Sequence, residues 1–336
     1  MREAPVVSLV LSCRDAEADI EGAIVAVLEQ DWPRDRLELL VADGMSMDAT
    51  REIVAHLATQ DTRIQLVDNA GGSRVAGLNA CIRRARGDVI VRVEPRARYD
   101  AGFVRGCVEA LDRTGADDVG GSVMPEGRSF FQRCAAAALK SPFAAGIAAS
   151  RGDAYRREIF ERAGLFDPNA GADEDAELAL RVAAAGGRVC HSPDLVLRYR
   201  VRDSARTLAR RCFKEGQGRA RTVIKHRRVA AQGPALSFLG LAGEAAVLLS
   251  SRWHRLAWWT FGGYVLAAGA EAVRMGRQEG PLAVPVVWAL FPAVQLARGV
   301  GFAAGLVRYA VRPDWDATER LGPIVVPAEA VATSVT

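Results

Sequence analysis

The first part of the chain alternates short, uninterrupted apolar runs with longer segments of amphipathic spacing. The apolar runs predict strands at Val6–Ser12, Leu37–Ala42, Arg63–Val67 and Asp88–Val93. The amphipathic segments predict helices at Ile20–Gln30, Thr50–Leu57 and Val75–Ala85. This alternation is typical of an α/β fold whose parallel sheet is covered by helices on both faces. Ligands of such sheets lie beyond the carboxyl ends of the strands, so the polar residues after each strand are the candidates for chemistry.

The pattern is less regular beyond Gly120, where helices dominate the prediction. They are expected at Phe130–Leu139, Glu158–Ala163, Asp173–Ala185 and Ala205–Ile224. The third of these has an acidic first turn and stops at Gly186-Gly187, and both features are usual helix-end signals.

Three apolar runs follow Pro234, at Ala235–Ser251, Leu256–Val273 and Leu282–Tyr309. Their lengths are about those needed to cross a bilayer, and tryptophans and arginines at their ends are typical of a membrane interface. Glu244 and Glu271 interrupt the first two runs, so buried helices of a soluble accessory domain are the alternative. We therefore predict an α/β domain at 1–228, a membrane-associated helical region of two or three apolar segments at 229–312, and an irregular tail at 313–336.

Composition and charge narrow the class of protein. Apolar residues make up 50% and charged residues 25% of the 336-residue chain, which excludes a disordered protein. A basic block from Arg198 to Arg228, opposed only by Asp203 and Glu215, attracts phosphates of any kind. Nucleic acid is a poor candidate partner because no aromatic platform or binding module accompanies the block.

The cysteines and the N-terminus indicate a cytosolic placement. Six cysteines are scattered without a CxxC pair, which argues against a zinc site or disulfide framework and fits a reduced compartment. Met1–Pro5 runs directly into an apolar strand and lacks the basic segment followed by an apolar segment that is typical of a signal peptide.

The segment Asp43–Thr50 ends the second predicted strand with the letters DGMSMDAT. Gly44 allows a tight bend, and Ser46 or Asp48 can cap the next helix. Asp43 can equally hydrogen-bond a nucleotide base at the strand end. The segment alone does not decide between these two interpretations.

Several further stretches, in the same order and spacing, make the chain similar to family 2 glycosyltransferases. In the first half they are Val6–Arg14, Asp43–Thr50, Asn69, Ala76–Asn79 and Arg86–Arg92. The likeness continues through Gly120-Gly121, Tyr155–Phe160, Gly164–Asp167, Glu174–Leu178, Gly216–Thr222 and Gly299–Gly305. It most resembles the succinoglycan-type, chain-elongating enzymes of polysaccharide synthesis.

The resemblance implies a GT-A fold: a Rossmann-like catalytic domain with a mostly parallel sheet, followed by C-terminal membrane helices. It implies an inverting enzyme that moves a hexose from a nucleotide-diphosphate sugar to a lipid-linked or growing glycan acceptor, for envelope or exopolysaccharide synthesis. The implied location is the cell membrane, with the catalytic domain on the cytosolic face. Two alternatives remain open: a polyprenyl-phosphate sugar synthase, and a non-catalytic membrane homologue that still binds nucleotide.

The resemblance also implies roles for individual residues. Asp175 matches the catalytic base, and the dipole of the predicted helix favours its ionised form. Alternatively, the acidic residues of this first turn merely balance the partial positive charge of the helix N-terminus; they are Asp173, Glu174 and Asp175. The implied donor-binding residues are Asp43, Ser46, Asn79, Glu94, Arg96, Arg219 and Arg221. The implied acceptor-side residues are Gly120, Gly121, Tyr155 and Glu174.

The stretch Glu94-Pro95-Arg96 departs from the family, which carries Asp-x-Asp or Asp-Ala-His here to hold a divalent cation. Glu94 is the predicted ligand of Mg²⁺ or Mn²⁺, whereas Arg96 cannot bind a cation. Either Glu94 holds the metal together with the diphosphate and waters, or Arg96 supplies the positive charge, or the site is impaired. We expect a weakened or partly replaced metal site.

Overall fold

The computed structural model describes residues 3–144, 152–227, 240 and 254–315. A mixed sheet with the strand order β3-β2-β1-β4-β7-β6-β8-β5 forms its centre. The strands, in chain order, are β1 (Val7–Cys13), β2 (Leu37–Asp43), β3 (Ile64–Asp68), β4 (Val89–Val93), β5 (Ala97–Tyr99), β6 (Asp118–Glu126), β7 (Ala154–Arg156) and β8 (Val189–Arg200).

The parallel part of the sheet comprises β3, β2, β1 and β4. The predicted strands are confirmed here to within a residue at either end. In the other half β7 is antiparallel to β4 and β6, β6 is parallel to β8, and β5 is antiparallel to β8. The sheet is therefore mixed, and its parallel half is the part that the apolar runs predicted.

Helices cover both faces of the parallel strands. Residues Leu9, Leu11 and Val41 point to one face, where α1 (Ile20–Leu28), α2 (Thr50–Gln60) and α4 (Phe103–Thr114) pack. Residues Val10, Leu40 and Ala42 point to the other face, where α3 (Arg74–Arg84), α6 (Glu158–Ala163) and α7 (Glu174–Ala184) pack. Alternate side chains of one strand thus serve two cores, which explains why these strands are mostly apolar.

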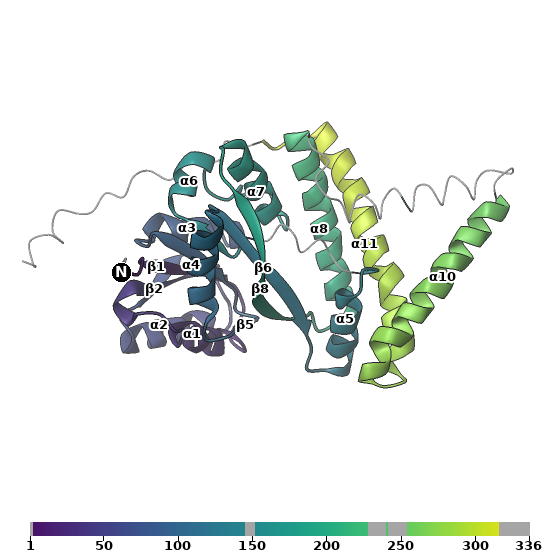
Figure 1. Ribbon diagram of the computed structural model, residues 1–336, viewed down its shortest axis with the longest axis horizontal. Helices are drawn as coiled ribbons and strands as arrows, with labels where there is room; N and C mark the ends of the chain where they lie inside the picture. The colour runs from purple at the N-terminus through teal and green to yellow at the C-terminus, as the bar shows by residue number, and fades with distance from the viewer. Residues whose placement is uncertain (1–2, 145–151, 228–239, 241–253, 316–336) are drawn as a thin grey trace, which may run out of the picture.

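The C-terminal helices pack on the catalytic part. Helices α5 (Phe130–Lys140), α8 (Ala205–His226), α10 (His254–Gly276) and α11 (Ala283–Val311) share one apolar core. Figure 1 shows α11 lying along α8. Gly301 permits this approach, because a Cβ atom there would overlap the carbonyl oxygen of Phe213.

In the described part of the chain, α11 is the one helix long and apolar enough to cross a membrane. The most apolar 18-residue stretch of α11 has a mean hydropathy of 1.5, and 39% of that stretch is buried inside the protein. The two or three spanning segments of the sequence prediction are therefore reduced to one among the described residues. Glu271 and the tryptophans of α10 make that helix less apolar, and Ala235–Ser251 lies almost entirely outside the described residues. Of the predicted tail, only residues 313–315 are described.

Candidate functional site

A cavity of about 230 Å³ opens at the carboxyl ends of β1 and β4, and we call it the strand-end cavity. Its lining comes from the loop after β1, the start of α3, the end of β4, β8 and α8. The lining residues are Ser12, Cys13, Arg14, Asp15, Ala16, Gly72, Arg74, Leu78, Arg92, Val93, Glu94, Pro95, Arg96, Tyr199, Arg202 and Arg211. The cavity lies where a parallel sheet is expected to bind its ligand.

Positive charge dominates the strand-end cavity. Its arginines are Arg14, Arg74, Arg92, Arg96, Arg202 and Arg211, and its carboxylates are Asp15 and Glu94. A concave surface lined in this way attracts anions, and guanidinium groups can form paired hydrogen bonds to phosphate oxygens. The arrangement fits a diphosphate.

Arg92 links the predicted base to the end of β4. Its side chain is 1% exposed, and it contacts the Asp175 carboxylate while lying 3.7 Å from Glu94. Arg74, from the first turn of α3, lies 2.6 Å from Glu174 and 3.4 Å from Glu94. Four predicted site residues are thus brought together at one edge, namely Glu94, Arg96, Glu174 and Asp175.

Arg92 and Arg74 were not among the residues predicted for the site. The available signal was Arg92 itself, a single charged residue inside the apolar run Val89–Val93. A charge at a buried strand position requires a partner, because an unpaired buried charge is very costly. Its partner Asp175 lies 83 positions further along the chain, so the sequence pattern did not reveal the pair.

Asp43 and Ser46 hold the turn after β2. Asp43 is 1% exposed and accepts hydrogen bonds from the backbone N–H and the hydroxyl of Ser46, at 3.3 and 2.5 Å. The Ser46 hydroxyl oxygen in turn accepts from the backbone N–H of Asp15 at 2.9 Å. The Asp43 carboxylate therefore fixes the wall of the strand-end cavity and does not line it in this structure.

Two residues of these loops adopt left-handed backbone conformations, Asp15 with φ 48° and Met45 with φ 58°. Such conformations are strained for residues other than glycine and persist where surrounding contacts enforce them. Here the Asp15 carboxylate accepts from the backbone N–H of Met47 at 2.9 Å, which ties the two loops together. The wall of the cavity is therefore built in advance of any ligand.

Arg221 was expected at the donor, and the structure places it among protein partners. Its side chain is fully buried, 2.8 Å from Asp167 and 2.7 Å from Asp314, and it lies 5.5 Å from the ring of Trp315. Lys225 also contacts Asp167. Because protein partners surround the guanidinium group, it joins α8 to neighbouring segments and does not reach the strand-end cavity.

Arg219 and Asn79, which were also expected at the donor, have internal partners as well. Arg219 is 7% exposed and lies 2.9 Å from Asp173, the residue preceding α7. Burial raises the pKa of Asp173 to about 7, although Arg219 counteracts it. Asn79 donates to the carbonyl of Phe166 at 2.8 Å and accepts from its N–H at 3.0 Å. Neither side chain lines the strand-end cavity.

Three of the predicted acceptor-side residues also lie away from the cavity lining. Tyr155 is 1% exposed and packs its ring 5.3 Å from that of Phe160, and burial raises the pKa of its hydroxyl well above the usual value. Gly120 and Gly121 belong to β6, where a Cβ atom at Gly121 would overlap the carbonyl oxygen of Leu195. These residues pack the sheet, and only Glu174 of the predicted set approaches the cavity.

The lining does not fit a cation held by protein ligands. The predicted metal ligand Glu94 lies between the guanidinium groups of Arg74 and Arg92, which carry the charge that a cation would supply. Within the described ranges no group of three His, Cys, Asp or Glu side chains could hold a metal ion. Arg96 lies 3.7 Å from Asp19 and 3.5 Å from Asp203.

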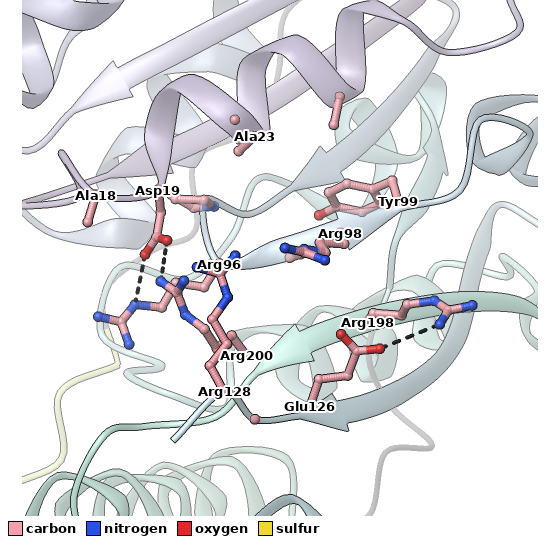
Figure 2. Close-up of a pocket in the computed structure, with 15 residues that line it drawn as sticks. Ala18, Asp19, Ala23, Arg96, Arg98, Tyr99, Glu126, Arg128, Arg198 and Arg200 are labelled. Carbon is pink, nitrogen blue, oxygen red and sulfur yellow. Dashed lines mark hydrogen bonds and ion pairs between the residues drawn. The ribbon is translucent and has the colours of Figure 1, made fainter. Parts of the chain in front are cut away.

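A second cavity of about 520 Å³ adjoins the first, and we call it the α1 cavity (Figure 2). It is lined by Ala18, Asp19, Gly22, Ala23, Ala26, Pro95, Arg96, Ala97, Arg98, Tyr99, Glu126, Gly127, Arg128, Arg198 and Arg200. Pro95 and Arg96 line both cavities, so the two spaces meet at the segment after β4.

Comparison with known proteins identifies the family. The model of Glycosyl transferase family 2 matches residues 8–158. The succinoglycan biosynthesis protein ExoA of Rhizobium meliloti is 30% identical over 233 residues, which cover 65% of this chain and 70% of that protein. The probable glycosyltransferase YdaM of Bacillus subtilis is 27% identical over 214 residues, covering 57% of this chain and 50% of that protein.

A solved structure supports the fold. The mannosyltransferase PcManGT of Pyrobaculum calidifontis, in complex with GDP-Man and Mn²⁺, superposes with a TM-score of 0.61 at 23% identity. The match covers 91% of this chain and 88% of that protein. It extends the similarity beyond the residues of the family match.

Proposed function

We propose that the chain, which belongs to glycosyl transferase family 2 and is a GT-A glycosyltransferase that uses a nucleotide sugar, is an inverting hexosyltransferase. Its acceptor is a lipid-linked or growing glycan of envelope or exopolysaccharide synthesis. The single observation that carries the proposal is the strand-end cavity, where arginines surround the end of β4 beside the Asp175 carboxylate. The similarity to a succinoglycan biosynthesis protein supports the polysaccharide context.

The donor diphosphate is proposed to bind in the strand-end cavity. Its negative charge is balanced by guanidinium groups of Arg14, Arg74 and Arg202, which line the cavity from three different segments. The same groups stabilise the nucleoside diphosphate as it leaves, because they remain in place while charge develops on the departing oxygen. The proposed donor residues are those at this edge, with Asp43 and Ser46 shaping the wall.

Asp175 is proposed as the catalytic base. It accepts the proton of the acceptor hydroxyl as that oxygen attacks the anomeric carbon from the face opposite the diphosphate, so the sugar configuration inverts. Asp175 lies in the first turn of α7, where the helix dipole favours the ionised carboxylate. Its side chain is 19% exposed, which leaves it accessible to an acceptor.

We also propose attachment to the cell membrane, with the catalytic part on the cytosolic face where nucleotide sugars occur. The apolar helix α11 supports this, and its packing on α8 would hold the catalytic part at the membrane surface. The proposed division is a catalytic domain at 1–228 and a helical region at 229–312.

The test is transfer from radiolabelled nucleotide sugars to membrane lipids by the wild-type chain and by Asp175→Asn. General-base loss should lower kcat by about 10²–10⁴-fold while the affinity for the nucleoside diphosphate is retained. Glu161→Gln, a first-turn carboxylate of α6, is the matched control and should leave kcat unchanged. A variant Asp175→Asn with wild-type kcat would show that the carboxylate only complements the helix end. NMR of the product would show the anomeric configuration.

A further inference from the structure

The α1 cavity carries more positive charge than its own carboxylates neutralise. Its arginines are Arg96, Arg98, Arg128, Arg198 and Arg200, and its carboxylates are Asp19 and Glu126. Figure 2 shows Asp19 paired with Arg96 and Arg200. It also shows Glu126 paired with Arg198. The Glu126–Arg198 pair is loose, at 3.5 Å. The uncompensated charge predicts an anionic ligand.

Arg98 and Arg128 are the clearest part of this excess. Both side chains are exposed, and neither forms an ion pair with any residue of the described ranges. They approach the cavity from different segments, since Arg98 belongs to β5 and Arg128 follows β6. Two guanidinium groups converging from separate segments suit an anion with several oxygens, such as a diphosphate.

The position of the cavity connects the donor with the apolar helices. On one side it shares Pro95 and Arg96 with the strand-end cavity. On the other side, Glu126–Arg128 lead directly into α5, whose residues Cys134–Ala138 share a core with α10 and α11. Figure 1 shows β6 and β8 extending from the sheet toward α5. An anion bound here lies between the donor edge and the candidate membrane helix.

We propose that the α1 cavity binds the diphosphate that links an acceptor glycan to its lipid, an inference that rests on the proposed function. The lipid chain then extends along α5 toward α10 and α11, and the glycan extends toward Arg96 and the donor. Phe130, the 42% exposed first residue of α5, offers apolar surface beside Arg128. The arginines thereby position the acceptor and take no part in bond formation.

The test is titration of farnesyl diphosphate into the full chain in detergent, with saturating UDP or GDP present to occupy the strand-end cavity. The wild-type chain should bind it. Arg98→Glu and Arg128→Glu should each weaken binding roughly tenfold, because each loses a charged hydrogen bond and adds repulsion. Arg84→Glu, the same change on the exposed end of α3, should bind as the wild type does.

Three results would show that the α1 cavity is not the binding site. They are the absence of binding beside saturating nucleotide, wild-type affinity in both cavity variants, and an equal loss in Arg84→Glu. Inorganic pyrophosphate bound as tightly as farnesyl diphosphate would refute the lipid-linked source and leave a site for free anions. Failure of the proposed function is a separate result: a chain that binds neither UDP nor GDP contradicts the donor site, while the farnesyl diphosphate titration still decides the α1 cavity.

Discussion

Replacing Arg221 by Met should destabilise the protein without impairing the donor site. The guanidinium group and its partner Asp167 are both fully buried, and a second carboxylate, Asp314, lies 2.7 Å away. Removing one member of a buried ion pair costs about 3–5 kcal/mol, because the other charge is left without compensation. Lys225 still contacts Asp167 in the variant, so we expect the lower end, about 3 kcal/mol.

This loss converts into a measurable melting shift. Unfolding entropy of about 2.1 cal/mol/K per residue gives roughly 0.7 kcal/mol/K for the chain, so the expected fall in Tm is about 4 °C. Arg210→Met, an exposed position of the same helix, should cost less than about 0.5 kcal/mol and shift Tm by under about 1 °C. Tryptophan fluorescence during heating measures both.

Donor kinetics separate the two interpretations of Arg221. At a temperature where the variant is folded, its KM for the nucleotide sugar should equal that of the wild type, since the side chain lies outside the strand-end cavity. A variant that melts with the wild type but shows a tenfold higher donor KM would refute the structural role. It would support the donor-binding role that the family resemblance implied for Arg221.

Three further changes test other parts of the structure. Ser46→Ala removes the hydroxyl that joins Asp43 to Asp15, so donor KM should rise roughly fivefold in steady-state assays, and an unchanged KM would exclude a role for this turn. Asp173→Asn should abolish a pH dependence of folding stability, because a carboxyl pKa raised to about 7 makes the wild type lose up to a few kcal/mol of stability as pH rises from about 4 to 7. Denaturant titrations at pH 5 and 8 measure the free energy of unfolding, and a variant that loses as much stability between these pH values as the wild type refutes the prediction. Gly301→Ala should lower Tm by several degrees by pushing α11 off α8, whereas Gly262→Ala, which has open space, should not, and equal melting of the two would contradict the close packing.

The sequence predicted the parallel half of the fold well, because burial makes the strands β1 to β4 mostly apolar. It did not predict the mixed half, where β7 is only Ala154–Arg156 and pairs with strands distant in the chain. Short strands of this kind are selected by tertiary packing and leave little pattern.

The site was predicted in part, for a related reason. Arg92 contacts Asp175 and lies 3.7 Å from Glu94, yet it was not among the predicted site residues. Arg221 was expected at the donor, but its guanidinium group is buried against two carboxylates. Those partners, Asp167 and Asp314, lie 54 and 93 positions away. Charges that are compensated over such distances cannot be distinguished from surface charges by sequence alone.

Titration of UDP and GDP into the full chain, in the presence of a chelator, tests most directly whether arginines hold the donor diphosphate. We predict that the wild type binds a nucleoside diphosphate without metal. Arg74→Gln, at the cavity end of α3, should weaken this binding roughly tenfold, while Arg84→Gln at the far end of the same helix should not. Binding that disappears in chelator, returns with Mn²⁺ and is indifferent to Arg74→Gln would show that a cation holds the diphosphate and that the arginine account is wrong.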